Sequence, residues 1–373
     1  MRLESARWAS QIPRRPWRPS DPGTWGRPEA LQGAGVGSPG RTALTRLAHH
    51  LRDQLIEIER GLAVRFGEGP AVLRLVGPDR VEALNRVVSQ EVRTLPAGEG
   101  RLALLLAPKG QFRALMAVVA GSEELWLLSP AGREETLRAS LGRYLAFSKS
   151  ALEPPGPGAV PVLVLGPRWT EVAAAAGAAV DVVAAGGCSV TGLPGEDVRW
   201  FGQTLQGVPG GLAHCSTDVA AAGVELLARS LGACPAGAAA VELARIRVGF
   251  PAWGQELTDA VLPAEVGIEP LTISYSKGCY VGQETVARMK TYGHANRCLV
   301  GVRQTDGADA TTELPIPLVA AGEEKPRGTL TSLAFHPDLG GVGLALVRRE
   351  LAAAGTRLRG AGRTFEITPI PLW

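Results

Sequence analysis

The sequence lacks several of the patterns that would assign a chain to a simple class. It contains no run of about 18 apolar residues free of charge, so a membrane-spanning helix is not expected. Its five cysteines, at positions 188, 215, 234, 279 and 298, form no C-x-x-C pair. Their odd number and long spacings favour neither a disulfide framework nor a zinc site. We therefore expect a cytoplasmic protein without a metal site.

An excess of charge is also missing from most of the chain. The net charge of +3 arises in residues 1–41, which carry seven arginines against three acids. The remainder is close to neutral, so we expect neither a nucleic-acid-binding face nor a membrane-binding one. Residues 1–41 are rich in Pro, Arg and Gly, a composition that disfavours a packed core. We expect them to form a disordered tail.

Common catalytic motifs are absent as well. The chain has no Walker A sequence, no G-x-S-x-G and no H-E-x-x-H. The glycine-rich stretch 33–40 follows no strand and has a proline where a helix should begin, so it fails as a dinucleotide-binding loop. We interpret it as a linker.

What the sequence does contain is an ordered series of strands and helices. Apolar segments typical of strands alternate with helical periodicity in the order β-α-β-β-β-α, over residues 71–77, 78–92, 101–108, 114–120, 124–130 and 133–149. This order mixes hairpins with crossovers and predicts an α+β layer.

The second half of the chain has a different texture. A proline-rich stretch at 153–161 predicts a boundary, and a second α/β portion follows it. That portion includes a predicted helix–turn–helix over 224–249. From residue 293 onward, short strands broken by Gly and Pro predict a small β-barrel.

The octapeptide KGCYVGQE, residues 277–284, is the clearest chemical signal. We expect a helix to begin near Tyr280, which would place Cys279 at its N-terminus, where unpaired N–H groups favour a thiolate. Lys277 adds a positive charge that would lower the pKa of this thiol. The motif thus predicts a nucleophile, a redox group or a metal ligand. The alternative is that Cys279 is a small buried apolar residue. We expect the other four cysteines to be structural.

This motif resembles that of the YgfZ family of folate-binding proteins, which act in iron–sulfur cluster assembly or repair. The family is related to the T-protein of the glycine cleavage system. The resemblance spans about residues 43–373, with matching blocks at 84–92, 107–116, 143–149, 245–288 and 327–349. It implies an α+β, T-protein-like three-part cloverleaf with two α/β portions and a C-terminal small β-barrel. Residues 42–292 would form the folate-binding region, and residues 293–373 the barrel.

The resemblance also implies a tetrahydrofolate pocket beside Cys279. Candidate folate-binding residues are Tyr280, Gln283, Glu284, Arg247, Glu265, Arg288 and Arg297. Arg245 is a further candidate, because the anionic tail of folates favours cations. Glu284 either orients the start of the helix or is a solvated acid.

Two departures from the T-protein bear on its chemistry. Arg113 and Ala114 stand where the T-protein has the aspartate pair associated with methylene transfer. Arg247 stands where it has the glutamate that binds the pterin, and arginine offers only hydrogen-bond donors. Glu242 and Glu265 are the candidates to replace that carboxylate.

The function that these features predict is a folate-binding accessory protein for the assembly or repair of iron–sulfur proteins, with Cys279 as its reactive thiol. Its partners would be folate and, transiently, iron–sulfur enzymes or assembly factors. A folate-dependent aminomethyltransferase and a non-catalytic scaffold on the same fold are the alternatives.

Overall fold

A computed structural model describes residues 39–156, 160–181, 188–193, 196–202, 204–293, 295–306 and 313–373. The chain divides into two compact units, Met1–His50 and Leu51–Trp373. The described residues of the first unit form the start of helix α2 (Pro39–Arg60), and all other elements belong to the second unit. Residues 1–38 of the predicted tail lie outside the described residues, and residues 39–41 belong to the start of α2.

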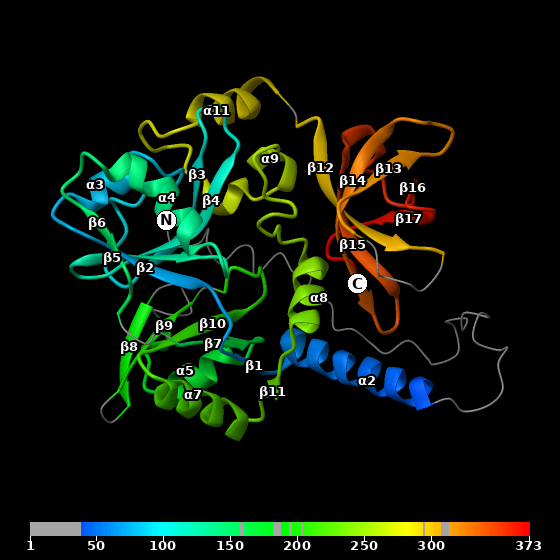
Figure 1. Ribbon diagram of the computed structural model, residues 1–373. Coiled ribbons are helices and arrows are strands. Elements are labelled where there is room, and N and C mark those ends of the chain that lie inside the picture. Colours follow the sequence, from blue (N-terminus) through cyan, green and yellow to red (C-terminus); the bar gives the residue numbers. More distant parts are fainter. Residues whose placement is uncertain are drawn as a thin grey trace. The chain divides into compact units, whose positions relative to one another are not determined.

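The first layer of the second unit is an antiparallel sheet covered by two helices. Its described strands follow the order β3-β4-β5-β2-β6 (Figure 1). The strands are β2 (Ala71–Val76), β3 (Gly100–Leu106), β4 (Phe112–Ala120), β5 (Glu124–Ser129) and β6 (Ala151–Glu153), and the helices are α3 (Arg80–Asn85) and α4 (Glu134–Leu145). Leu84, Leu137 and Leu141 of the helices share one buried cluster with Leu73 and Leu125 of the sheet. The predicted β-α-β-β-β-α order is confirmed, although α3 ends earlier than the sequence predicts.

The second layer is a mixed sheet in the order β11-β1-β7-β10-β9-β8 among the described strands. These strands are β1 (Ala63–Phe66), β7 (Val160–Leu165), β8 (Cys188–Leu193), β9 (Glu196–Phe201), β10 (Gly210–Cys215) and β11 (Cys234–Pro235). Helices α5 (Trp169–Ala175) and α7 (Asp218–Ser230) pack on it through Trp169, Val172 and Val224. The hydroxyl of Thr217 caps α7 by accepting a hydrogen bond from the Ala220 N–H at 3.2 Å, which is a favoured way to satisfy a helix start.

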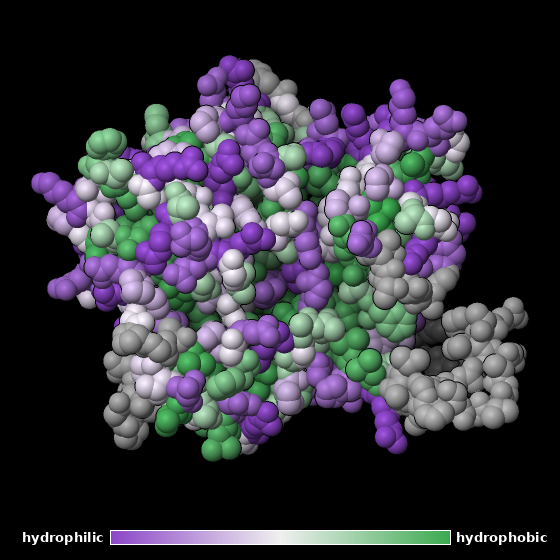
Figure 2. All heavy atoms as spheres, in the orientation of Figure 1, coloured by the Kyte–Doolittle hydropathy of each residue, from purple (hydrophilic) through white to green (hydrophobic). Residues whose placement is uncertain are grey.

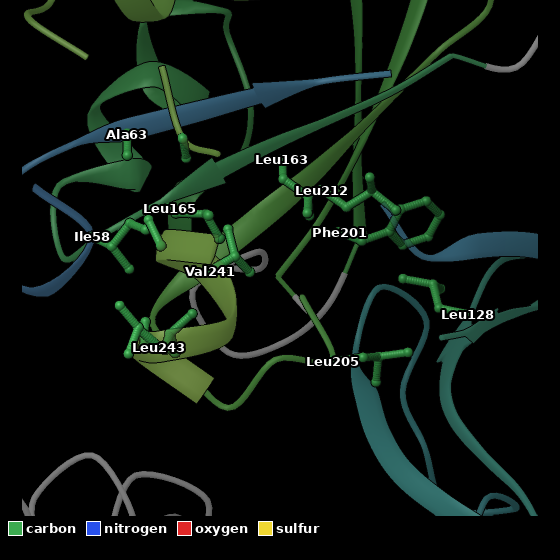
Figure 3. Packing of buried hydrophobic residues seen from close by; sticks show 14 of the residues in the cluster. Ile58, Ala63, Leu128, Leu163, Leu165, Phe201, Leu205, Leu212, Val241 and Leu243 are labelled. Carbon is green, nitrogen blue, oxygen red and sulfur yellow. The ribbon is translucent and has the colours of Figure 1, made fainter. Parts of the chain in front are cut away.

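A shared core joins these layers to helix α8 (Ala238–Val248). Leu163 and Leu212 of the second sheet, Leu128 of the first and Val241 of α8 belong to one buried cluster (Figure 3). Leu344 of the C-terminal barrel belongs to the same cluster. The two sheets and the barrel therefore share one packed core with α8. A change of volume in this core would affect all of them, because packed interiors transmit strain.

The C-terminal part is a closed barrel with the strand order β12-β15-β14-β13-β16-β17. Its strands are β12 (Arg297–Gln304), β13 (Ile316–Ala320), β14 (Pro326–His336), β15 (Gly340–Arg348), β16 (Arg357–Gly360) and β17 (Arg363–Thr368), with a short 3-10 helix η2 (Arg349–Leu351). Alternate residues such as Val302, Leu330 and Phe365 fill its interior. The predicted α+β fold class with a C-terminal small β-barrel is confirmed.

Three short helices connect α8 to the barrel. They are α9 (Pro263–Val266), α10 (Glu269–Thr272) and α11 (Gln283–Tyr292). The KGCYVGQE motif lies between α10 and α11 and enters the first turn of α11. Among the described helices, none combines the length and apolar character that a bilayer crossing requires.

Candidate functional site

Lys277 points into the protein. Its side chain belongs to a residue only 7% exposed, and its Nζ donates hydrogen bonds to three backbone carbonyls, those of Asn85 at 2.7 Å, Val88 at 2.6 Å and Gln90 at 2.9 Å. An ammonium group has three protons to donate, and each finds an acceptor here. Burial lowers the pKa of Lys277 to about 8, so the group is still charged at neutral pH.

Lys277 therefore fastens the motif to the loop that follows α3. Ser89, in the same loop, adds to this connection. Its hydroxyl donates to the Thr272 carbonyl at 2.6 Å, and its own carbonyl accepts from the Ser274 N–H at 3.0 Å. The block at 84–92 and the motif at 277–284, far apart in sequence, thus form one hydrogen-bonded unit.

Cys279 lies on the outside of this unit. Its side chain is exposed, whereas Lys277 and Tyr280 on either side are buried. Tyr280 packs in an apolar cluster with Leu104 and Val286, and burial raises its pKa to about 12. The Lys277 Nζ lies 5.3 Å from the centre of the Tyr280 ring, within the range of a cation–π contact. The buried side chains of Lys277 and Tyr280 therefore hold the loop in place, and the thiol of Cys279 between them points to solvent.

Helix α11 begins at Gln283, later than the position near Tyr280 that the sequence predicts. Cys279 is therefore part of the loop before the helix and not of its first turn. Gly282 forms the N-cap with φ of +83°, and a Cβ on it would lie 2.6 Å from the Ala107 carbonyl oxygen. Only glycine adopts a positive φ without strain and also lacks the Cβ atom that would collide with this oxygen. This close approach packs the motif against the turn between β3 and β4.

Glu284, the last residue of the motif, faces solvent at the start of α11. Glu284 and Arg288 form an ion pair of 2.6 Å in which the side chains are 76% and 73% exposed. Gln283 is half-buried. The surface around α11, near the top of the view, is largely hydrophilic (Figure 2). An exposed pair of this kind contributes little to stability, so Glu284 has the character of a solvated helix-surface acid.

The other predicted folate-binding residues have partners elsewhere. Glu265 accepts two hydrogen bonds from Arg297, at 2.7 and 2.8 Å, and also caps α9 at the Leu262 N–H. Arg247 donates to the main-chain oxygen of Trp373 at 3.2 Å, and its Nε lies 3.4 Å from Glu59. The described contacts of these three residues do not include Cys279.

Arg245 is fully buried at the junction of α8 with the barrel. Its guanidinium binds the carboxylates of Glu242, at 2.6 Å, and Glu256, at 3.1 Å. It also donates to the Ser332 hydroxyl of β14 at 2.7 Å. Neither Arg245 nor Glu242 therefore presents an unengaged group to a folate. Sequence reasoning missed Glu256 and Ser332, and no local pattern marks them.

Arg113 occupies a β-bulge. Leu105 of β3 pairs with Ala114 of β4, and the next residue, Leu106, pairs with Phe112, so Arg113 is the extra residue between them. Bulges redirect side chains and often lie next to functional sites. The side chain of Arg113 is exposed, while Ala114 is buried. No carboxylate stands at these two positions.

No group of three or more His, Cys, Asp or Glu residues suited to a metal ion occurs in the described ranges. Cys279 is thus a single potential ligand. Iron–sulfur clusters generally take about four protein ligands, so this thiol alone does not form a resident cluster site.

Comparison with known proteins places the chain among relatives of aminomethyltransferases. It is 29% identical over 153 residues to the aminomethyltransferase of Corynebacterium jeikeium, covering 39% of each chain. It is 31% identical over 182 residues to the aminomethyltransferase of Shouchella clausii, covering 48% of this chain and 45% of that one. The chain thus matches less than half the length of these relatives.

A solved structure shares the fold. The aminomethyltransferase T of the glycine cleavage system from Bartonella henselae superposes with a TM-score of 0.74 and 17% identity, covering 87% of this chain and 89% of that one. The three-part T-protein architecture is therefore confirmed. The model of the GCVT N-terminal domain matches residues 71–276, more than half of the sequence. The chain belongs to the GCVT N-terminal domain family.

Proposed function

We propose that this protein is a cytoplasmic, folate-binding accessory factor for the assembly or repair of iron–sulfur proteins, and that Cys279 is its reactive thiol. The observation that carries the proposal is the exposure of Cys279 between two buried anchors, Lys277 and Tyr280. Packing does not require an exposed thiol at this point, whereas a thiol that meets a partner protein must be accessible. The partners of the proposal are iron–sulfur enzymes or their assembly factors.

The chemistry available to Cys279 is limited because no second cysteine accompanies it in the motif. Because it is the only cysteine of the motif, it supplies one ligand to an iron centre and needs a partner protein or a small thiol to supply the others. The anchoring by Lys277 and Tyr280 fixes the backbone on both sides of it. The loop therefore offers a positioned, single thiolate ligand for a transient encounter.

Replacement of Cys279 by serine is expected to abolish this function while the fold stays intact. The side chain is exposed, so the free energy of unfolding should change by less than about 0.5 kcal/mol. The measurement is the activity of iron–sulfur enzymes in cells that lack the native chain and express the variant. The matched control is Cys298→Ser, which alters a half-buried thiol of the barrel strand β12 and should leave activity in place.

Full activity in the Cys279→Ser cells would contradict the role of the thiol. That result would favour the scaffold alternative, in which the fold serves only to bind partners. Loss of activity in both variants would instead point to a general requirement for folding, which unfolding curves would reveal.

Folate enters the proposal through the family, and the usual pterin-binding position does not fit it. Arg247 offers only donors, and it is already engaged with Glu59 and the Trp373 oxygen. The carboxylates of Glu242 and Glu265 are bound by arginines. A folate on this chain must therefore use other groups.

Calorimetric titration with tetrahydrofolate tests this part independently of the thiol. The native chain is expected to bind, and Arg247→Gln is expected to bind with an affinity within about threefold of it, less than 1 kcal/mol, because Arg247 is directed toward Glu59. Absence of binding in the native chain would remove folate from the proposal. A large loss of affinity in Arg247→Gln would show that this arginine contacts the ligand.

The names of the relatives favour aminomethyl transfer as the second candidate function. The site lacks the acids associated with it, because Arg113 and Ala114 occupy their positions. We therefore rank it below the thiol-based function.

A further inference from the structure

Helix α7 carries apolar residues on the side that faces away from the protein. Its inner side packs on the second sheet through Val224 and Ala228. Val219, Ala222 and Leu226 recur at a spacing of three and four residues, which places them on one face of a helix. All three are exposed, Val219 by 73% and Leu226 by 70%. We call these three residues the outer face of α7.

An apolar outer face requires an explanation on a helix at the surface. Surface helices normally carry polar residues opposite their buried stripe, and a helix that is apolar on all sides is normally covered. Helix α5 packs beside α7, and its Ala174 and Ala175 are exposed as well. Apolar side chains gather over this part of the surface in the lower part of Figure 2. Exposed apolar surface of this kind often marks an interaction site.

The two ends of α7 carry opposite charges. Asp218 is exposed at the N-terminal end. Arg229 lies at the C-terminal end with its side chain 51% exposed, although it also pairs with Glu225 at 2.6 Å. Two copies of α7 packed antiparallel would bring Asp218 of each copy toward Arg229 of the other. A parallel pair would instead bring like charges and like ends of the helix dipoles together.

The apolar residues fit the same antiparallel arrangement. With a two-fold axis between Ala222 and Gly223, Val219 of each copy would meet Leu226 of the other. The small residues at 222 and 223 would let the two helices approach closely at the axis. A two-fold interface uses the same surface on both subunits, so a surface that is complementary to itself fits a second copy of the chain.

We propose that α7 forms the contact of a two-fold dimer, in which the outer faces of two α7 helices pack antiparallel. The helix has 13 residues and is about 20 Å long, so the contact is small for a specific interface. The dimer should therefore form at concentrations of about 10–100 µM and dissociate on dilution. Because α7 and α11 lie at opposite ends of the view in Figure 1, the dimer leaves Cys279 accessible and does not depend on the proposed function.

Sedimentation equilibrium with a reductant present, at protein concentrations that span the expected dissociation constant, tests the dimer. Leu226→Lys should weaken association at least about tenfold, because each dimer loses two buried leucines. Leu226 is exposed, so the unfolding curve of this variant should match the native one. The matched control is Leu47→Lys, the same change at a leucine of α2 that is 63% exposed, which should associate like the native protein.

Cysteine substitution determines the orientation of the two helices. In a Cys279→Ser background, Ala222→Cys should form an intermolecular disulfide with copper phenanthroline as oxidant, because both copies lie next to the axis. In the antiparallel pair, the two copies of Ser230→Cys would be about 22 Å apart along the helices. A disulfide joins Cα atoms no more than about 7 Å apart, so this variant should not cross-link. The Cys279→Ser protein alone controls for the other cysteines and should stay monomeric on denaturing gels.

Three results would overturn the proposal. The first is a native protein that is monomeric at every concentration. In that case, a loss of stability in Leu226→Lys would mean that another part of the same chain covers the outer face, and unchanged stability would leave the face to a different protein. The second is equal association of Leu226→Lys and Leu47→Lys. The third is cross-linking of Ser230→Cys as fast as that of Ala222→Cys, which would contradict the antiparallel arrangement.

Discussion

Replacing Lys277 by methionine is expected to lower the free energy of unfolding by about 3–5 kcal/mol, because three buried carbonyl oxygens would lose their common donor. The ammonium group satisfies the carbonyls of Asn85, Val88 and Gln90. Methionine has a similar length and no donor, so it would leave these acceptors unpaired in a buried loop, each at a cost of about 1–3 kcal/mol before relaxation. Urea unfolding at neutral pH measures the change. Lys109→Met, on an exposed turn residue, is the control and should change stability by less than about 0.5 kcal/mol.

The same variant separates two roles for Lys277. The sequence predicts that its charge activates the neighbouring thiol, whereas the geometry makes it an anchor of the loop. If it is an anchor, Lys277→Met should be much less stable, yet the pH profile of Cys279 alkylation should match the native one under conditions where both are folded. A variant of unchanged stability whose alkylation requires more alkaline pH would show that Lys277 acts on the thiol.

The order of elements could be predicted because it depends on local patterns. Strands such as β2 and β5 are short apolar runs bounded by turn residues, and this signal does not require knowledge of the partner strand. The helix predicted over 78–92 is wrong beyond Asn85, where α3 ends. The carbonyls of Asn85, Val88 and Gln90 accept hydrogen bonds from Lys277, so a residue far along the chain satisfies the acceptors that follow the helix. A local window contains no sign of this.

The candidate site was predictable to a similar extent. Its motif stands in the sequence, and the resemblance marks the block at 84–92 that the structure brings against it. What the sequence does not contain is the direction of each side chain. Lys277 and Cys279 are two positions apart, yet one is buried and the other exposed. Their orientations depend on Ser89, Gly282 and the β3–β4 turn, which only the fold brings into contact.

Replacing Arg245 by methionine should lower the free energy of unfolding by about 3–5 kcal/mol as well, for a different reason. The loss would leave the carboxylate of Glu256, whose side chain is 0% exposed, without its cation. The control is Arg288→Met, which removes an equal charge from an exposed pair with Glu284 and should change stability by less than about 0.5 kcal/mol. Chemical denaturation of both variants gives the comparison.

A double variant, Arg245→Met with Glu256→Gln, distinguishes a buried ion pair from simple packing. Glutamine keeps the shape of Glu256, and its Oε1 can still accept hydrogen bonds from the hydroxyls of Thr331 and Ser332. The double variant should therefore be more stable than the sum of the single changes predicts, by about 1–3 kcal/mol. Strict additivity would mean that Arg245 contributes through its other contacts, which include Glu242, Phe250 and Ser332. A positive coupling would identify the pair as a charged link between α8 and the segment that follows it, in which Glu256 lies.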